Sequence, residues 1–348
     1  MFRVVVFSGI AFGVAYLLYV FPVLALLSLF RDDDILSLWS LGPTALVFVL
    51  IRLYLATSIT NRALRAFVFY GMGIGFLSAL ILSVLLLARW AGGFDGQALG
   101  VIAVLAVTSV TAYSIHNANS LVVRNLTFTS DRIAAPRRLA FISDVHVGSN
   151  PPAHLRKICD RLQQLEFDAL LIGGDLFDSS DFQLQHINAL GHLDREIFFV
   201  TGNHEGYVGG FEALLARFSE LNIRILDNAA ADLRGINLIG VSDMQSSAAK
   251  VQAIDSLYRS GRFNLALVHQ PSIWTKTDSE IDLMLCGHTH NGQIWPFTLL
   301  VRLQFRHVHG LFVEGLSNLY VSSGVGCWGP RMRLGSRNEI VMIDLVPA

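Results

Sequence analysis

Five short polar motifs in the last two-thirds of the chain constrain its fold more than any other feature. Each contains Asp, Asn or His, and each comes at the end of an apolar run that is typical of a buried strand. The runs cover residues 139–142, 169–172, 197–200, 265–268 and 281–285. The motifs are Asp144-Val145-His146, Gly174-Asp175-Leu176-Phe177-Asp178, Gly202-Asn203-His204-Glu205, His269-Gln270 and Gly287-His288-Thr289-His290. Because open α/β sheets place their sites at the carboxyl ends of strands, we expect strands of one sheet to present all these side chains along one edge.

The order of these motifs also resembles the calcineurin-like metallophosphoesterase superfamily, over residues 120–348. The resemblance implies an α/β domain of two packed mixed β-sheets flanked by helices, with metal-dependent phosphodiesterase or pyrophosphatase activity. Within it we expect a first strand over residues 121–129. Helices are expected over residues 152–165, 182–190, 211–221 and 249–258.

The resemblance further implies two metal sites. Asp144, His146 and His290 would bind one divalent ion, and Asn203, His269 and His288 would bind the other, with Asp175 bridging both. Mixed carboxylate and imidazole ligands suit Mn²⁺, Fe or Zn²⁺ better than Mg²⁺ or Ca²⁺, and the resemblance favours manganese. Two such ions ~3.5 to 4 Å apart would lower the pKa of a bridging water toward ~7, so that hydroxide becomes the nucleophile.

Three residues next to these ligands have expected supporting roles. The family pattern makes His204 the catalytic residue that protonates the leaving oxygen or stabilises the transferring phosphoryl group, and a histidine titrates near working pH. Asp178 and Glu205 are expected to accept ring N–H bonds and so fix histidine tautomers. The alternative for both carboxylates is a solvated position in a loop.

The first third of the chain is apolar enough to be a membrane domain. The chain has a mean hydropathy of +0.50 with 15% charged residues, and four apolar runs cover residues 4–30, 38–59, 66–88 and 99–115. These lengths predict a four-helix transmembrane domain over residues 1–118, before a phosphoesterase domain over residues 119–348. The first run is too long for a cleavable signal peptide and should remain as an anchor. A buried helical bundle is the alternative.

The arginines near these runs are distributed unevenly. One side of the expected membrane has Arg31 and Arg89, and the other side has a larger set: Arg3, Arg62, Arg65, Arg124, Arg132, Arg137 and Arg138. The positive-inside rule then predicts an inner-membrane protein with both termini and the catalytic domain in the cytoplasm. A net charge of −1 and the lack of a basic stripe with interleaved aromatics argue against nucleic acid as a partner.

The segment after His290 indicates the substrate class. It resembles the membrane-associated branch of the superfamily, which includes enzymes that cleave the pyrophosphate of UDP-2,3-diacylglucosamine. Its bulky apolar residues suit an acyl chain, and its basic residues suit a phosphate or headgroup. These candidate substrate-binding residues are Trp295, Phe297, Phe305, Arg302, Arg306 and His307. Trp328, Arg331, Arg333 and Arg337 are candidates to complete a headgroup pocket.

Other interpretations are compatible with the same residues. The apolar segment after His290 could instead pack on the domain core or on the membrane helices. The protein could be a phosphatase of soluble or protein phosphoesters, or a metal-stabilised membrane scaffold without turnover. A complete ligand set together with His204 argues against the scaffold.

Overall fold

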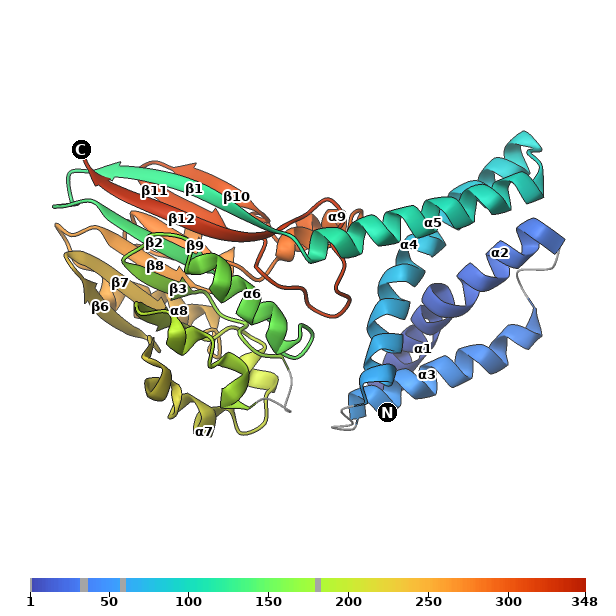
Figure 1. Cartoon of the computed structure of the whole chain (residues 1–348), viewed down its shortest axis with the longest axis horizontal. Helices are drawn as coiled ribbons and strands as arrows, with labels where there is room; N and C mark the ends of the chain where they lie inside the picture. Colours follow the sequence, from blue (N-terminus) through green and yellow to red (C-terminus); the bar gives the residue numbers. More distant parts are fainter. Residues whose placement is uncertain (1, 32–36, 57–60, 179–182) are drawn as a thin grey trace. The chain divides into compact units, whose positions relative to one another are not determined.

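The computed structural model describes residues 2–31, 37–56, 61–178 and 183–348. It divides into two compact units, Met1–His116 and Asn117–Ala348, and Figure 1 shows their helices and strands. The expected domain boundary after residue 118 lies close to this division. The assignment of the two units as transmembrane and catalytic domains stays a prediction.

Helices make up most of the described residues of the first unit. Its segments are α1 (Phe2–Ala15), a π-helical turn (Tyr16–Val20), α2 (Phe21–Arg31), a 3₁₀ turn (Leu38–Ser40), α3 (Leu41–Ala56), α4 (Arg62–Gly92) and α5 (Gly96–Ala118). The side chain of Asn61 accepts hydrogen bonds from the first turn of α4. Gly93 ends that helix with a φ of 63°, a conformation that glycine adopts without a steric cost.

Three helical segments in the described part of this unit have the length and composition to cross a membrane: Val6–Arg31, Ala63–Gly92 and Gly96–Ala118. The described residues thus support three of the four expected spans. The apolar helix Leu38–Tyr54 is shorter, and at 1.5 Å per residue it extends about 25 Å, less than the ~30 Å hydrocarbon core. The expected end of that run at residue 59 lies outside the described residues.

Most of the apolar surface of these three segments is not covered by protein. The buried share of their most apolar windows is 22% in the first, 33% in the second and 22% in the third. A helix that is apolar all round needs either a protein core or lipid around it. The low burial therefore argues against a buried helical bundle and favours a membrane.

The second unit contains two six-stranded mixed sheets. The first has the order β1 (Leu121–Ser130), β12 (Asn338–Pro347), β2 (Arg137–Ile142), β3 (Ala169–Ile172), β4 (Glu196–Phe199) and β5 (Ile223–Ile225). The second has the order β10 (Gly310–Glu314), β11 (Ser317–Val321), β9 (Leu283–Cys286), β8 (Asn264–Val268), β7 (Ile236–Val241) and β6 (Ala229–Leu233). Strands β2, β3 and β4 are parallel, as are β7, β8 and β9. The expected pair of mixed sheets is confirmed.

Alternation of side chains along each strand builds three cores. In β2, Leu139 and Phe141 join the core that also contains Leu265 and Leu283 of the other sheet. The alternate residues of β2 face the opposite way, into the core formed with helix α6 (Pro152–Leu162). A third core lies between the second sheet and helix α8 (Ser247–Leu257). The unit is thus two sheets packed face to face between outer helical layers.

The helical segments differ in part from those expected. Helix α6 ends at Leu162, three residues before the expected end, and α8 lies close to its expected range. The expected helix 211–221 is a short α7 (Phe211–Leu215) followed by a 3₁₀ turn. The expected α-helix 182–190 is wrong in its described part, because residues 184–187 and 190–192 form separate 3₁₀ turns with i to i+3 hydrogen bonds; residue 182 lies outside the described residues.

Candidate metal centre

The polar motifs follow the carboxyl ends of parallel strands from both sheets. Asp144 and His146 come after β2, Asp175 after β3, and Asn203 after β4 in the first sheet. The other ligands come from the second sheet, where His269 follows β8, and His288 and His290 follow β9. The expectation that one sheet carries all these side chains is wrong, because the strands belong to two sheets. The loops still converge, because the two sheets pack against each other.

Five of these residues have a left-handed backbone conformation. The φ angles are 57° at Asp144, 49° at His146, 52° at Asp175, 71° at His288 and 51° at His290. A non-glycine residue with such a φ costs roughly 1–3 kcal/mol and persists only where the surrounding structure imposes it. In the β2 and β3 loops, hydrogen bonds hold this conformation at Asp144 and His146. The N–H of Asp144 donates to the Gly174 carbonyl and the N–H of His146 donates to the Asp175 carbonyl, both at 3.0 Å. Strain of this kind collects at functional sites.

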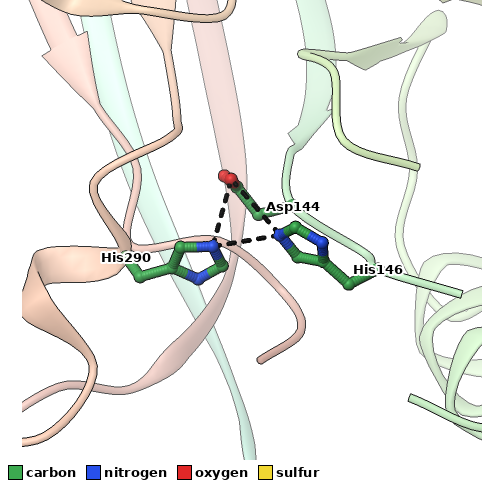
Figure 2. Close-up of side chains that lie close together, drawn as sticks. All are labelled: Asp144, His146 and His290. Atoms are coloured by element: carbon green, nitrogen blue, oxygen red, sulfur yellow. Dashed lines mark hydrogen bonds and ion pairs between the residues drawn. The ribbon is translucent and has the colours of Figure 1, made fainter. Parts of the chain in front are cut away.

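One set of candidate ligands consists of Asp144, His146 and His290 (Figure 2). The Nε2 atoms of the two histidines lie 3.1 Å apart. Asp144 Oδ1 lies 3.4 Å from Nε2 of His290 and 3.9 Å from Nε2 of His146. All three donor atoms therefore point at a common position.

A second set consists of Asp175, His269 and His288. Asp175 Oδ2 lies 3.1 Å from His269 Nε2, and that nitrogen lies 3.2 Å from His288 Nδ1. The same Oδ2 atom is 3.7 Å from Nε2 of His146 in the first set. Asp175 is therefore the residue that joins the two sets, as a bridging ligand would.

The donors in these sets fit divalent metal ions. In each set two ring nitrogens face each other, which is favourable only if a proton or a cation lies between them. The buried Oδ1 of Asn203 has no hydrogen-bond partner among the described residues, so it can act as an oxygen ligand. Burial alone would lower the pKa of His269, but the adjacent Asp175 carboxylate raises it to about 10. The site thus attracts positive charge, and its mixed nitrogen and oxygen donors suit a transition metal.

The two supporting carboxylates differ in role. Asp178 Oδ2 lies 3.3 Å from Nδ1 of His146, and its role in orienting that ring for metal binding through Nε2 stays a prediction. Glu205 accepts no ring N–H bond among the described residues, which corrects the expectation for it. Its buried carboxylate instead accepts backbone N–H bonds from Asp175, Phe177 and Gly202 at 3.0, 3.0 and 2.6 Å. It holds the β3 and β4 loops together.

His204 lies beside the candidate ligands. Its backbone N–H donates to Asp175 Oδ1 at 2.9 Å, and its ring stands edge to face with that of His146 at 4.8 Å between centroids. The centroid of the Trp328 ring lies 5.9 Å from that of the His204 ring. Burial lowers the pKa of His204 below its ordinary value. Its catalytic role stays a prediction.

Among the predicted substrate-binding residues, Phe305 contacts the metal centre. Its ring lies 5.2 Å from that of His288. His307 packs edge to face against Trp274 and Phe312 at 5.1 and 4.7 Å, which is a packing contact. Four lie on the solvent side of the same segment: Trp295, Phe297, Arg302 and Arg306. Their role in substrate binding stays a prediction.

Arg333 is not part of a headgroup pocket, because its side chain is fully buried. The guanidinium donates to the carbonyls of Ser323 and Gly326, both at 2.6 Å, and to the carbonyl of His290 at 3.2 Å. It therefore ties the loop that carries His290 to the loop after β11. Nothing in the local sequence distinguishes this arginine from its exposed neighbour Arg337, so sequence reasoning missed its structural role.

Comparison with known proteins assigns the family. The model for "Calcineurin-like phosphoesterase" matches residues 137–292, and "Phosphodiesterase YaeI" of Escherichia coli (strain K12) is 31% identical over 247 residues, 65% of this chain and 88% of that protein. The chain belongs to the calcineurin-like phosphoesterase family. An "Uncharacterized metallophosphoesterase" of Helicobacter pylori (strain J99) is 36% identical over 229 residues, 62% of each chain. A "Transmembrane protein with metallophosphoesterase domain" of Danio rerio is 30% identical over 234 residues, 61% of this chain and 53% of that protein.

These similarities support the predicted family. The predicted family, whose members are metal-dependent phosphoesterases with a dinuclear centre, is confirmed. The chain spans about 62% of the length of its Helicobacter pylori relative, so the activity of the whole protein is a matter for proposal. The finer assignment to enzymes of UDP-2,3-diacylglucosamine stays a prediction.

Proposed function

We propose that this protein is a membrane-bound phosphodiesterase or pyrophosphatase that acts through a dinuclear centre of divalent metal ions. The observation that carries the proposal is the position of Asp175, whose Oδ2 lies within 3.1 Å of one histidine set and 3.7 Å of the other. One carboxylate oxygen shared between two sets of inward-pointing nitrogens is the arrangement that a two-metal hydrolase requires.

The candidate ligands would bind the metal ions, and His204 would transfer a proton. Asp144, His146 and His290 would hold one ion, and Asn203, His269 and His288 the other. Bound divalent ions supply Lewis-acid polarisation of phosphoryl oxygens and lower the pKa of water toward neutrality. His204, adjacent to both sets through Asp175 and His146, would donate a proton to the leaving oxygen or a hydrogen bond to the phosphoryl group.

A lipid-linked substrate, such as UDP-2,3-diacylglucosamine, is the substrate class that we propose. Three apolar segments long enough to cross a membrane support it, and so does the Phe305 ring at the edge of His288. The names of two relatives, a transmembrane protein and a phosphodiesterase, agree with this class. A substrate with a UDP group would require the catalytic unit to face the cytoplasm of the inner membrane.

The test is a substrate panel with the full-length protein in detergent, supplied with Mn²⁺, Fe²⁺ or Zn²⁺. We expect hydrolysis of bis(p-nitrophenyl) phosphate and faster hydrolysis of a diacyl lipid with a phosphodiester or pyrophosphate bond. Phe305→Ser should raise KM for the lipid more than for the soluble ester, because a buried aromatic ring contributes ~1.5 to 3 kcal/mol of transfer free energy. Preference for p-nitrophenyl phosphate over both diesters would favour a phosphatase instead.

A further inference from the structure

The helix α9 (Phe297–Gln304), just after the last candidate metal ligands, exposes an apolar surface. Leu299, Leu300 and Leu303 are 52, 56 and 85% exposed, and we call these three side chains the α9 surface. The one buried residue of this helix is Thr298, whose hydroxyl donates to the Asn291 carbonyl at 3.0 Å. The helix is thus attached to the domain on its polar side and leaves its leucines uncovered.

The exposure of these three leucines argues against the alternative that the apolar segment after His290 packs on the domain core. Single exposed leucines are ordinary, but three within five residues on one short helix form a contiguous patch. Trp295, two residues before the helix begins, is also exposed, at 56%. Tryptophan and leucine together on an amphipathic helix are typical of elements that lie in the interface of a bilayer.

Hydrogen bonds attach the end of an apolar helix to the loop that supports α9. The candidate span Gly96–Ala118 ends where the second unit begins. The Asn117 side chain donates to the Arg333 carbonyl at 3.3 Å, and the Asn338 side chain donates to the Ala118 carbonyl at 2.7 Å. In the same loop, the Leu334 carbonyl accepts a hydrogen bond from the backbone N–H of Trp295 at 2.8 Å. The residues that leave the apolar helix and those that begin α9 are therefore held by one loop.

Two arginine side chains lie close in sequence to the α9 surface. Arg302 lies within the helix and Arg306 two residues after it, and both are exposed. In the described part of the chain, neither has a recorded ion pair with a carboxylate. Exposed arginines beside an apolar surface are placed to contact anionic headgroups while the leucines enter the acyl region.

We infer that α9 is an interfacial helix, which inserts Leu299, Leu300 and Leu303 into the membrane and places Arg302 and Arg306 among anionic headgroups. The occupant of the α9 surface is the lipid bilayer that surrounds the apolar helices of this same chain. The helix leads directly to Phe305, which contacts the ring of His288. Insertion would therefore hold the metal centre at headgroup depth. The inference deepens the proposed function, and the insertion itself requires no turnover.

The experiment measures the depth of residue 303 in the full-length protein. Leu303→Cys is labelled with the environment-sensitive dye NBD; the native cysteines Cys159, Cys286 and Cys327 are all buried and leave this position as the reactive one. The protein is placed in nanodiscs of phosphatidylcholine with phosphatidylglycerol, with or without doxyl-labelled lipid. We expect blue-shifted emission that doxyl lipid quenches severalfold. The matched control is Ser256→Cys, an exposed position on α8, which should show neither effect.

Two outcomes at residue 303 would overturn the inference. Emission like that of the Ser256 control would show that the α9 surface stays in water. A blue shift without quenching by doxyl lipid would show that protein covers the surface, either a second copy of this chain or its own first unit. The role of the two arginines in binding anionic headgroups is tested with Arg302→Gln combined with Arg306→Gln. These substitutions should reduce quenching at residue 303 in discs with phosphatidylglycerol but not in pure phosphatidylcholine. Equal quenching in all four combinations would remove the headgroup role of the arginines.

A second variant separates this inference from the proposed function. Leu300→Glu combined with Leu303→Glu should leave metal content and hydrolysis of bis(p-nitrophenyl) phosphate unchanged, while KM for a lipid substrate in nanodiscs rises at least severalfold. An unchanged KM for the lipid would contradict a role of α9 in reaching the membrane. If the parent protein hydrolyses neither substrate but residue 303 is quenched, the proposed function fails and the interfacial helix stands.

Discussion

At the scale of single residues, the metal centre depends on side chains held in unfavourable backbone conformations. Asp175 combines a φ of 52° with contacts to both ligand sets. Asp175→Ala should reduce the metal content from two ions per chain to one or none and abolish phosphodiesterase activity, because no other carboxylate among the described residues is shared by the two sets. Elemental analysis and turnover measure this. Asp227→Ala, at an exposed position, is the control, and full activity of Asp175→Ala would remove the bridging assignment.

His204 offers a second test at this scale. It touches the ligands but is not needed to complete either set, so His204→Ala should leave metal occupancy near normal and lower kcat by ~10² to 10⁴. Steady-state kinetics together with metal analysis of the same sample distinguish the possibilities. Loss of metal would make His204 a ligand, and an unchanged kcat would make it a neighbour only. The exposed His192 provides the control substitution.

At the scale of elements, buried polar side chains connect loops that local sequence does not relate. Arg333 bonds three carbonyls in two loops, and a lysine would keep the charge but could not reach all of them. Arg333→Lys should lower the free energy of unfolding by ~2 to 4 kcal/mol and weaken metal binding at the set that contains His290. Thermal unfolding and metal titration would show it. The exposed Arg337→Lys should change neither.

Helix α6 supplies a pH-dependent contact. The ring of His154 lies 2.7 Å from the Val325 carbonyl, and burial lowers its pKa to about 4 from an ordinary 6.5. The unfolded chain therefore binds a proton at higher pH than the folded chain. The stability from the neutral ring is complete above about pH 6.5 and is lost as pH falls through 4, with about 2 kcal/mol lost by pH 5. His154→Gln keeps a donor without titrating, so its unfolding temperature should fall less between pH 7 and pH 5; an identical fall would exclude His154.

At the scale of the whole molecule, topology depends on the helix Leu38–Tyr54. If it crosses the membrane, four crossings place both termini on the same side; if it does not, the three longer segments place them on opposite sides. The arginine distribution predicts both termini in the cytoplasm. In cells, Trp39→Cys should then react with an impermeant maleimide and Ala63→Cys should not. A reporter fused after Ala348 should behave as cytoplasmic, and equal labelling of the two cysteines would contradict the crossing.

The sequence by itself determined the features that local patterns encode. Apolar runs followed by Asp, Asn or His predicted the strands β2, β3, β4, β8 and β9 closely, and the family pattern supplied the ligand residues that the structure brings together. Such features depend on side-chain alternation within a few residues and on the shared edge of parallel strands. Similarly, the alternation over residues 121–129 predicted β1, which the structure places at Leu121–Ser130.

Only the tertiary structure decided what depends on contacts between distant segments. Sequence could not show that Glu205 accepts backbone N–H bonds about 30 residues away, that Arg333 is buried against the loop of His290, or that α9 leaves its leucines exposed. A carboxylate, an arginine or a leucine has the same local pattern whether it is buried or solvated. Its environment is set by which loops pack around it, and the free energy of that packing arises from the whole fold rather than from neighbouring residues.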